Sequence, residues 1–130
     1  MNMANPELLC LNETMIAEDG LSGKDDIRME MRKWFPLDLQ WWNCSKPPKL
    51  GYSGTAVLIS KDFRAGRPLK VEFDGFGEPG VHDQEGRTII LYFKSFILVN
   101  SYVPNAGIGT LKRLNYRVDS WDKDFHRFLK

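Results

Sequence analysis

The order of apolar and polar residues predicts short strands between two helices. Residues 8–11 form a continuous apolar run after Pro6, which is typical of a strand covered on both faces inside a mixed or parallel sheet. Residues 69–74 alternate strictly between apolar and charged side chains. This alternation predicts a strand with one buried and one wet face, near the edge of a sheet. Residues 55–60 are a further β-rich segment.

Two more strands are expected close together in the second half of the chain. They cover residues 88–93 and 96–102, and only Lys94 and Ser95 separate them. A two-residue connection is typical of a β-hairpin, even without the favoured Asn-Gly pair. We therefore expect these two strands to pair antiparallel.

A helix is predicted near each end of the chain. Ser22 can cap a helix over residues 23–34, with two aspartates in its first turn to complement the helix dipole, and Pro36 stops it. Over residues 110–130, apolar side chains recur at steps of three and four, which predicts an amphipathic helix. The order strand, helix, several strands, helix indicates an α/β fold with antiparallel pairs.

Composition places the chain among ordinary globular proteins. A length of 130 residues, 42% of them hydrophobic, suits one domain with one core. Eighteen Lys and Arg against seventeen Asp and Glu leave a net charge of +1. Bulk charge alone therefore does not draw the chain to a polyanion, and any nucleic-acid contact is expected to be local.

The two cysteines and the N-terminal sequence indicate an intracellular protein. Cys10 and Cys44 cannot form a disulfide framework. Cys10 lies inside the first apolar run and is expected to be a buried free thiol, which suits a reducing compartment. The sequence has neither a signal-peptide pattern nor an apolar stretch approaching the roughly 18 residues of a membrane span, so no membrane association is expected.

The pattern also predicts an incomplete domain over residues 1–130. The first strand begins almost at Met1, and the last apolar helix runs to Lys130 without a glycine stop or a following strand. Two helices hardly supply the cover that a sheet buried on both faces needs. We therefore expect structural partners that these residues do not supply.

Four short segments in order carry a resemblance to a known family. They are Leu9-Cys10-Leu11-Asn12-Glu13-Thr14, Gly51-Tyr52-Ser53-Gly54, His82-Asp83-Gln84-Glu85-Gly86-Arg87 and Ser101-Tyr102-Val103-Pro104-Asn105-Ala106-Gly107. Together they resemble exonuclease III family AP endonucleases, particularly the eukaryotic type, from about Pro6 to Lys130. The resemblance implies part of an endonuclease/exonuclease/phosphatase-type four-layer α/β sandwich. We expect mainly one mixed β-sheet with flanking helices.

The same resemblance implies a partial catalytic set. Glu13 matches the family's metal-ligating glutamate, and a hard carboxylate oxygen suits Mg²⁺. Tyr102 and Asn105 match the phenol and the amide that point at the scissile phosphate, where negative charge accumulates in the transition state. Without the resemblance, Glu13 would be taken for a surface residue, and Tyr102 and Asn105 for residues that stabilise a strand exit.

The implied DNA-binding residues are Gly51, Tyr52 and Arg87. Gly51 and Tyr52 match a loop that lies against DNA, with a plain turn as the alternative. Arg87 matches an arginine that grips the DNA backbone, and a surface salt bridge is an equally good interpretation of the residue alone. His82 and Asp83 are sequence neighbours that seldom face each other, so we expect a loop hydrogen bond there and leave both out of the catalytic set.

The sequence departs from the family pattern in several places. Asn12 stands where a glutamine is usual, and Met15 and Ile108 stand where Lys and Arg are common, so weaker phosphate contacts are expected. An upstream strand with an Asn and an acidic residue is absent, as are the Gly-Asp-Leu-Asn and Ser-Asp-His segments. Those segments supply the general base, further metal ligands and a phosphate-pairing histidine.

The resemblance implies a DNA repair nuclease of base excision repair that hydrolyses the phosphodiester 5′ to abasic sites. The expected metal is Mg²⁺, with Mn²⁺ as a substitute, and the expected partner is double-stranded DNA containing abasic sites. We expect a nuclear protein, and a monomer if the domain is complete. Since part of the catalytic set is missing, the alternative is a non-catalytic nucleic-acid-binding or regulatory fragment. A phosphoinositide or sphingolipid phosphoesterase is disfavoured, because the Gly-Tyr-Ser-Gly and Tyr-Val-Pro-Asn-Ala-Gly segments resemble the DNA-acting branch.

Overall fold

The computed structural model describes residues 6–130 as six strands and two α-helices with short helical turns. The strands are β1 (Leu8–Asn12), β2 (Leu39–Asn43), β3 (Thr55–Ile59), β4 (Lys70–Phe73), β5 (Thr88–Tyr92) and β6 (Ile97–Ser101). The helices are α1 (Ile27–Trp34) and α2 (Asp122–Phe128), and two 3₁₀ turns (Glu18–Leu21, Gly23–Asp25) precede α1. A wider π-helical stretch, η3 (Tyr116–Trp121), leads directly into α2. No helix in the described part of the chain combines the length and apolar character needed to cross a bilayer.

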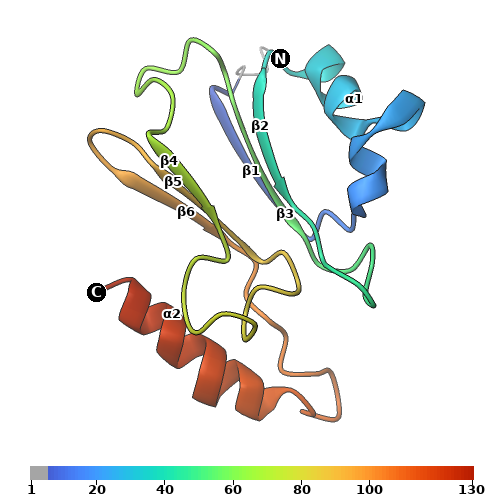
Figure 1. Cartoon of the computed structure of the whole chain (residues 1–130), viewed down its shortest axis with the longest axis vertical. Helices are drawn as coiled ribbons and strands as arrows, with labels where there is room; N and C mark the ends of the chain where they lie inside the picture. Colours follow the sequence, from blue (N-terminus) through green and yellow to red (C-terminus); the bar gives the residue numbers. More distant parts are fainter. Residues whose placement is uncertain (1–5) are drawn as a thin grey trace.

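The strands form two separate three-stranded sheets, with orders β1-β3-β2 and β4-β5-β6. Every strand pair is antiparallel. The α/β class and the 88–102 hairpin are therefore confirmed, whereas the expectation of mainly one mixed sheet is wrong. Figure 1 shows the two sheets side by side, with α1 on the side of the first sheet that faces away from the second.

The apolar run that suggested a central strand belongs to β1, at the edge of the first sheet. Its side chains alternate between two cores: Leu8 packs between the sheets, and Leu9 and Leu11 pack on the α1 side. A run that feeds two cores is continuously apolar even in an antiparallel edge strand, which explains the wrong choice of sheet type. Cys10 is exposed on this strand, so the expectation of a buried thiol is also wrong.

The main core lies between the two sheets. Val57 and Ile59 of β3 meet Ile89 and Leu91 of β5, and all four are fully buried. The other face of β3 packs under α1 through Ala56 and other apolar side chains. Because β3 is covered on both faces, it is the central element of the fold.

Helix α1 begins later than the expected 23–34 helix. The Asp26 carboxylate accepts the backbone N–H of Arg28 at 2.9 Å, so Asp26 caps the helix instead of Ser22. Gly23 has a φ of +74°, a left-handed conformation that interrupts an α-helix at the predicted start. Asp26 was expected in the first turn of the helix, whereas it stands at the N-cap position.

The C-terminal helical region also starts later than residue 110. Gly109 and Leu111 have φ values of +74° and +50°, which keep the preceding segment a turn. Trp121 is 1% exposed. Its ring packs edge-on against the Phe76 ring, with 5.3 Å between the ring centres, and lies tilted against the Phe125 ring, with 4.7 Å between the centres. The connection between β4 and β5 thereby fastens α2 beyond the end of the second sheet (Figure 1).

Asn100 joins the two sheets through hydrogen bonds across the core. Its Nδ2 donates to the carbonyls of Leu11 in β1 (3.1 Å) and Ala56 in β3 (3.0 Å). The Asn100 side chain lies in a buried position, with the residue 5% exposed. This contact fixes how the ends of β1 and β6 lie relative to each other.

We expect Asn100→Ala to lower the free energy of unfolding by about 2 kcal/mol, because two hydrogen bonds are lost where water cannot replace them. Urea unfolding followed by circular dichroism measures this change. The matched control is Asn115→Ala at an exposed position without a capping hydrogen bond, which should change stability by less than about 0.5 kcal/mol. Equal effects of the two substitutions would show that Asn100 does not join the sheets.

Candidate active site

Two loops at one end of the first sheet lie side by side. The Thr14 N–H donates to Gly54 O at 3.2 Å, and the Met15 N–H donates to Ser53 O at 2.8 Å. Glu13, Met15 and Ser53 have left-handed φ values of 56°, 53° and 57°. Such conformations are strained for residues other than glycine, and they cluster at functional sites. The loop after β1 and the loop before β3 are therefore tied to each other by their backbones.

Glu13 and Tyr102 meet where β1 and β6 end. Glu13 is exposed and follows the last residue of β1, and Tyr102 follows the last residue of β6. The pKa of the Tyr102 phenol is raised, first by burial and then by a hydrogen bond with Glu13 and by the negative charge of that carboxylate. The phenol is therefore protonated at neutral pH, as an ordinary tyrosine is, and it can donate one hydrogen bond.

Gly51 and Tyr52 lie next to the Glu13 loop. Gly51 has a φ of +67°, and a Cβ there would lie 3.5 Å from the backbone oxygen of Met15. Tyr52 is 38% exposed, and its N–H donates to Ser45 Oγ at 3.1 Å. The tyrosine is therefore held at its backbone while part of its ring remains open to solvent.

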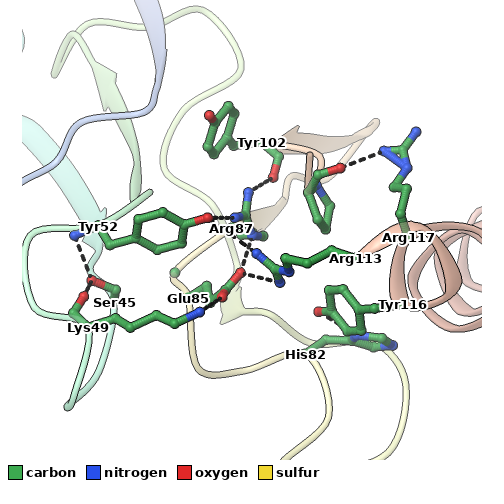
Figure 2. Close-up of polar contacts among 12 residues, drawn as sticks. Ser45, Lys49, Tyr52, His82, Glu85, Arg87, Tyr102, Arg113, Tyr116 and Arg117 are labelled. Atoms are coloured by element: carbon green, nitrogen blue, oxygen red, sulfur yellow. Dashed lines mark hydrogen bonds and ion pairs between the residues drawn. The ribbon is translucent and has the colours of Figure 1, made fainter. Parts of the chain in front are cut away.

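Arg87 is buried between the two tyrosines (Figure 2). Its guanidinium donates to Glu85 Oε2 at 2.8 Å, to the backbone oxygen of Tyr102 at 3.0 Å and to the hydroxyl of Tyr52 at 3.3 Å. Arg87 is 1% exposed, and its Cζ lies 4.9 Å from the centre of the Tyr102 ring. In this structure, Arg87 fixes the relative positions of Tyr52 and Tyr102, and its contact with DNA stays a prediction.

The Glu85 carboxylate bonds three cationic side chains. Its Oε1 accepts from Lys49 Nζ at 2.9 Å, and its Oε2 accepts from Arg113 at 2.9 Å as well as from Arg87. Arg113 also donates to the Tyr52 hydroxyl at 3.2 Å. Burial raises the pKa of Glu85, but the hydrogen bonds from Lys49, Arg87 and Arg113 outweigh burial and lower it to about 2. Figure 2 shows the carboxylate at the centre of this cluster.

Glycine is required between Glu85 and Arg87. Gly86 has a φ of +60°, and a Cβ there would lie 2.6 Å from the backbone oxygen of Asn43. The Thr55 hydroxyl donates to Gly86 O at 3.0 Å. The backbone at Gly86 therefore lies directly against the ends of β2 and β3, and this contact positions the segment that carries Glu85 and Arg87.

Asn105 lies three residues beyond Tyr102 in an exposed loop. Its Oδ1 accepts the N–H of Gly107 at 2.7 Å, so the Nδ2 group is the part of the amide that can donate outward. Arg113 N–H donates to Ala106 O at 2.9 Å and ties the loop to the start of the C-terminal helical region. The structure thus brings Glu13 and Tyr102 together, whereas the oxygen of the Asn105 amide is engaged within its own loop by Gly107.

The side chains of Met15 and Ile108, which replace the family's common Lys and Arg, are exposed. Met15 is 59% exposed and Ile108 is 91% exposed, so each side chain would offer an apolar surface to a ligand. His82 is buried, and its ring nitrogens bond Asp124 at 3.0 Å and Tyr116 at 3.2 Å instead of Asp83. These partners hold the loop before Glu85 against the C-terminal helical region, so the hydrogen bonds of His82 reach that region and do not stay within its own loop.

Local sequence patterns do not single out Lys49, Glu85 and Arg113. Glu85 and Arg87 are two residues apart in an extended segment, where alternate side chains share a face, and this was the one available signal. Lys49 and Arg113 lie far from both in the sequence, so only the tertiary structure brings them together. Among residues 6–130, no group of three or more His, Cys, Asp or Glu side chains is placed to hold a metal ion.

Comparisons with known proteins give relatives but no matching family model. A DNA-(apurinic or apyrimidinic site) endonuclease of Dictyostelium discoideum is 37% identical over 97% of this chain and 30% of its own length. The DNA repair nuclease APEX1 of Danio rerio is 41% identical over 96% of this chain and 35% of its own length. An exodeoxyribonuclease of Streptococcus pneumoniae is 32% identical over 96% of this chain and 43% of its own length. The chain therefore spans less than half the length of each of these curated relatives.

The low pKa of Glu85 makes part of the stability depend on pH. Because the pKa is about 2 in the folded chain and 4.5 ordinarily, the contribution is present above about pH 4.5 and is lost as pH falls toward about 2. We expect the wild type to exceed Glu85→Gln in stability by on the order of 2 kcal/mol near neutral pH, after allowing for solvent screening.

Urea unfolding between about pH 7 and about pH 3 measures the difference, which should shrink as the pH falls. Glu78→Gln, at an exposed position in the same connection between β4 and β5, is the control. It should show a small difference that does not change with pH. A stability difference for Glu85→Gln that stays constant with pH would contradict the ion-pair account.

Proposed function

We propose that this chain, an exonuclease III family segment by its motifs and by its relatives, supplies DNA binding and part of the catalytic set of an AP endonuclease. The parent reaction is hydrolysis of the phosphodiester 5′ to an abasic site in double-stranded DNA. We infer the substrate from the names of the relatives in Dictyostelium discoideum and Danio rerio. A nuclear location, and a monomeric state for the complete domain, are parts of the same proposal.

One observation carries the proposal: the carboxylate of Glu13 lies beside the phenol of Tyr102, close to a cationic cluster. Burial and Glu13 raise the pKa of Tyr102, and the Arg87 guanidinium stacks over the Tyr102 ring. A phosphodiester needs both kinds of group, because a cationic surface attracts the backbone and a hydrogen-bond donor stabilises charge on the reacting oxygens. A phenol next to a carboxylate and a guanidinium fits this requirement.

The donors in this chain suit a phosphate oxygen. The Tyr102 phenol has one O–H, which bonds Glu13 and would turn to the scissile phosphate when Glu13 binds the metal. Asn105 keeps its Oδ1 on Gly107, which leaves its Nδ2 hydrogens for a second donation. Each hydrogen bond would strengthen as negative charge develops on the phosphate oxygens.

Glu13 is the residue that would hold Mg²⁺, or Mn²⁺ in its place. Its exposed carboxylate at a loop end fits an ion that binds one or two carboxylates and completes its shell with water and substrate phosphate. When bound, the metal would supply neutralising charge at the phosphate and activate water. One carboxylate predicts weak binding of the metal in the absence of DNA.

Selectivity for abasic sites would come from the deformability of the duplex. DNA that lacks a base bends and opens at a lower energetic cost than an intact duplex. The cluster around Tyr52 contains charged and phenolic groups, which contact a backbone more readily than they distinguish bases. The proposed recognition is therefore of the backbone shape at the lesion.

The alternative function is non-catalytic binding of nucleic acid. Glu13 is a carboxylate that acts on the pKa of Tyr102, and the Gly-Asp-Leu-Asn and Ser-Asp-His segments, which in the family supply a general base and further metal ligands, do not occur in this sequence. Hydrolysis also needs such a base. We therefore expect these 130 residues to bind abasic DNA without incising it efficiently.

Fluorescence anisotropy with two labelled duplexes tests the proposal, one duplex intact and one carrying a single stable abasic analogue. We expect tighter binding of the abasic duplex in Mg²⁺. Tyr102→Phe should weaken that binding about tenfold, because one charge-assisted hydrogen bond is lost. Glu13→Ala should remove the part of the affinity that depends on Mg²⁺.

A denaturing gel of the same mixtures separates the two functions. Strand breaks that require Mg²⁺ and disappear in Glu13→Ala would assign catalysis to this chain itself, and binding without breaks would assign it binding alone. Tyr92→Phe is a matched control, because Tyr92 bonds Glu72 in the second sheet, away from this site. Equal binding of both duplexes, or equal effects of Tyr92→Phe and Tyr102→Phe, would contradict the proposal.

A further inference from the structure

The carboxylate of Glu85 makes it favourable for two arginines to share one phenol. Arg87 and Arg113 carry like charges, yet their guanidinium groups donate to the same Tyr52 hydroxyl at 3.3 and 3.2 Å. The Oε2 of Glu85 accepts from both arginines at 2.8 and 2.9 Å. A single negative oxygen between two guanidiniums offsets their repulsion, and partial burial strengthens this effect.

The shared bonds also orient the Tyr52 hydroxyl. A phenolic oxygen has two lone-pair directions and one O–H hydrogen. When Arg87 and Arg113 occupy the lone-pair directions, the remaining capacity of Tyr52 is donation by its own O–H. The hydroxyl is then prepared to donate to an external acceptor, such as a phosphate oxygen.

Lys49 completes the arrangement on the solvent side. Its Nζ bonds Glu85 Oε1 at 2.9 Å and lies 5.1 Å from the centre of the Tyr52 ring. The Lys49 side chain is 55% exposed, against 11% for Glu85. Three cations therefore surround one largely buried carboxylate, and an excess of positive charge remains for a polyanion.

We propose that Glu85 is a positioning residue for DNA recognition: it holds Arg87, Arg113 and Lys49 so that the Tyr52 hydroxyl donates to a backbone phosphate. This inference rests on the proposed DNA-binding function. Although Glu85 is negative, its removal weakens DNA binding, because the order of the donors is lost. Simple electrostatics requires the opposite result, since removal of a negative charge strengthens binding to DNA.

Anisotropy of the abasic duplex with single and double variants of the full chain tests this inference. Glu85→Gln adds one positive unit of net charge, and Glu85→Asp keeps the charge but shortens the side chain. We expect both to weaken binding about tenfold, a change that corresponds to one lost charge-assisted hydrogen bond. Glu78→Gln makes the same charge change at an exposed position and should bind as well as the wild type or slightly better. In Tyr52→Phe, further substitution of Glu85 should change the affinity less than about twofold, because the hydroxyl it positions is absent.

Nuclear magnetic resonance of the Arg side chains checks the mechanism without DNA. The Nε hydrogen of Arg87 and the Nη hydrogens of Arg113, which bond Glu85, should be protected from exchange in the wild type and lose that protection in Glu85→Asp. Near-ultraviolet circular dichroism confirms folding of each variant. If Glu85→Gln does not fold, Glu85→Asp alone gives the result, since it preserves the charge.

The possible failures differ. A wild-type chain that binds both duplexes equally would overturn the proposed function and this inference with it. A wild-type chain that prefers the abasic duplex, together with Glu85→Asp and Glu85→Gln variants that bind it equally well or better, would overturn this inference alone. Losses that are equal with and without the Tyr52 hydroxyl would also overturn it, because Glu85 would then act on overall stability.

Discussion

The buried guanidinium of Arg87 is the group on which the candidate site depends. A charge with 1% exposure must be paired, since an unpaired buried cation costs several kcal/mol. Arg87 satisfies this constraint with Glu85, the backbone of Tyr102 and the hydroxyl of Tyr52. Those partners come from three separate segments of the chain, so the pairing of one buried charge assembles the surface on which DNA is proposed to bind.

The core between the two sheets holds in place the strands that carry the candidate site. Asn100 joins β6 to β1 and β3, and the strained loop after β1 is bonded to the loop before β3. Glu13 and Tyr102, from different sheets, are therefore held at one rim without touching the main core. The rigid part of the molecule thus supplies position, and the loops supply the chemical groups.

Local patterns in the sequence predicted most strands, the hairpin of β5 and β6 and the presence of both helices. They could not predict the sheet arrangement, because an apolar run such as β1 looks the same in a buried parallel strand and in an edge strand that feeds two cores. The juxtaposition of Glu13 and Tyr102 was expected only through the family resemblance. Glu85 had a weak signal in its spacing from Arg87, whereas the parts played by Lys49 and Arg113 depend on contacts between distant segments.

Glu13 and Tyr102 are proposed to act on one metal-bound phosphate. The most direct measurement is the paramagnetic broadening of nuclear magnetic resonance signals by Mn²⁺ in the presence of the abasic duplex. The account predicts that the signals of Glu13 and of the Tyr102 ring broaden first and together, and that Glu13→Ala abolishes the effect on Tyr102. Broadening centred on another acidic part of the surface, with Tyr102 unaffected, would contradict the claim.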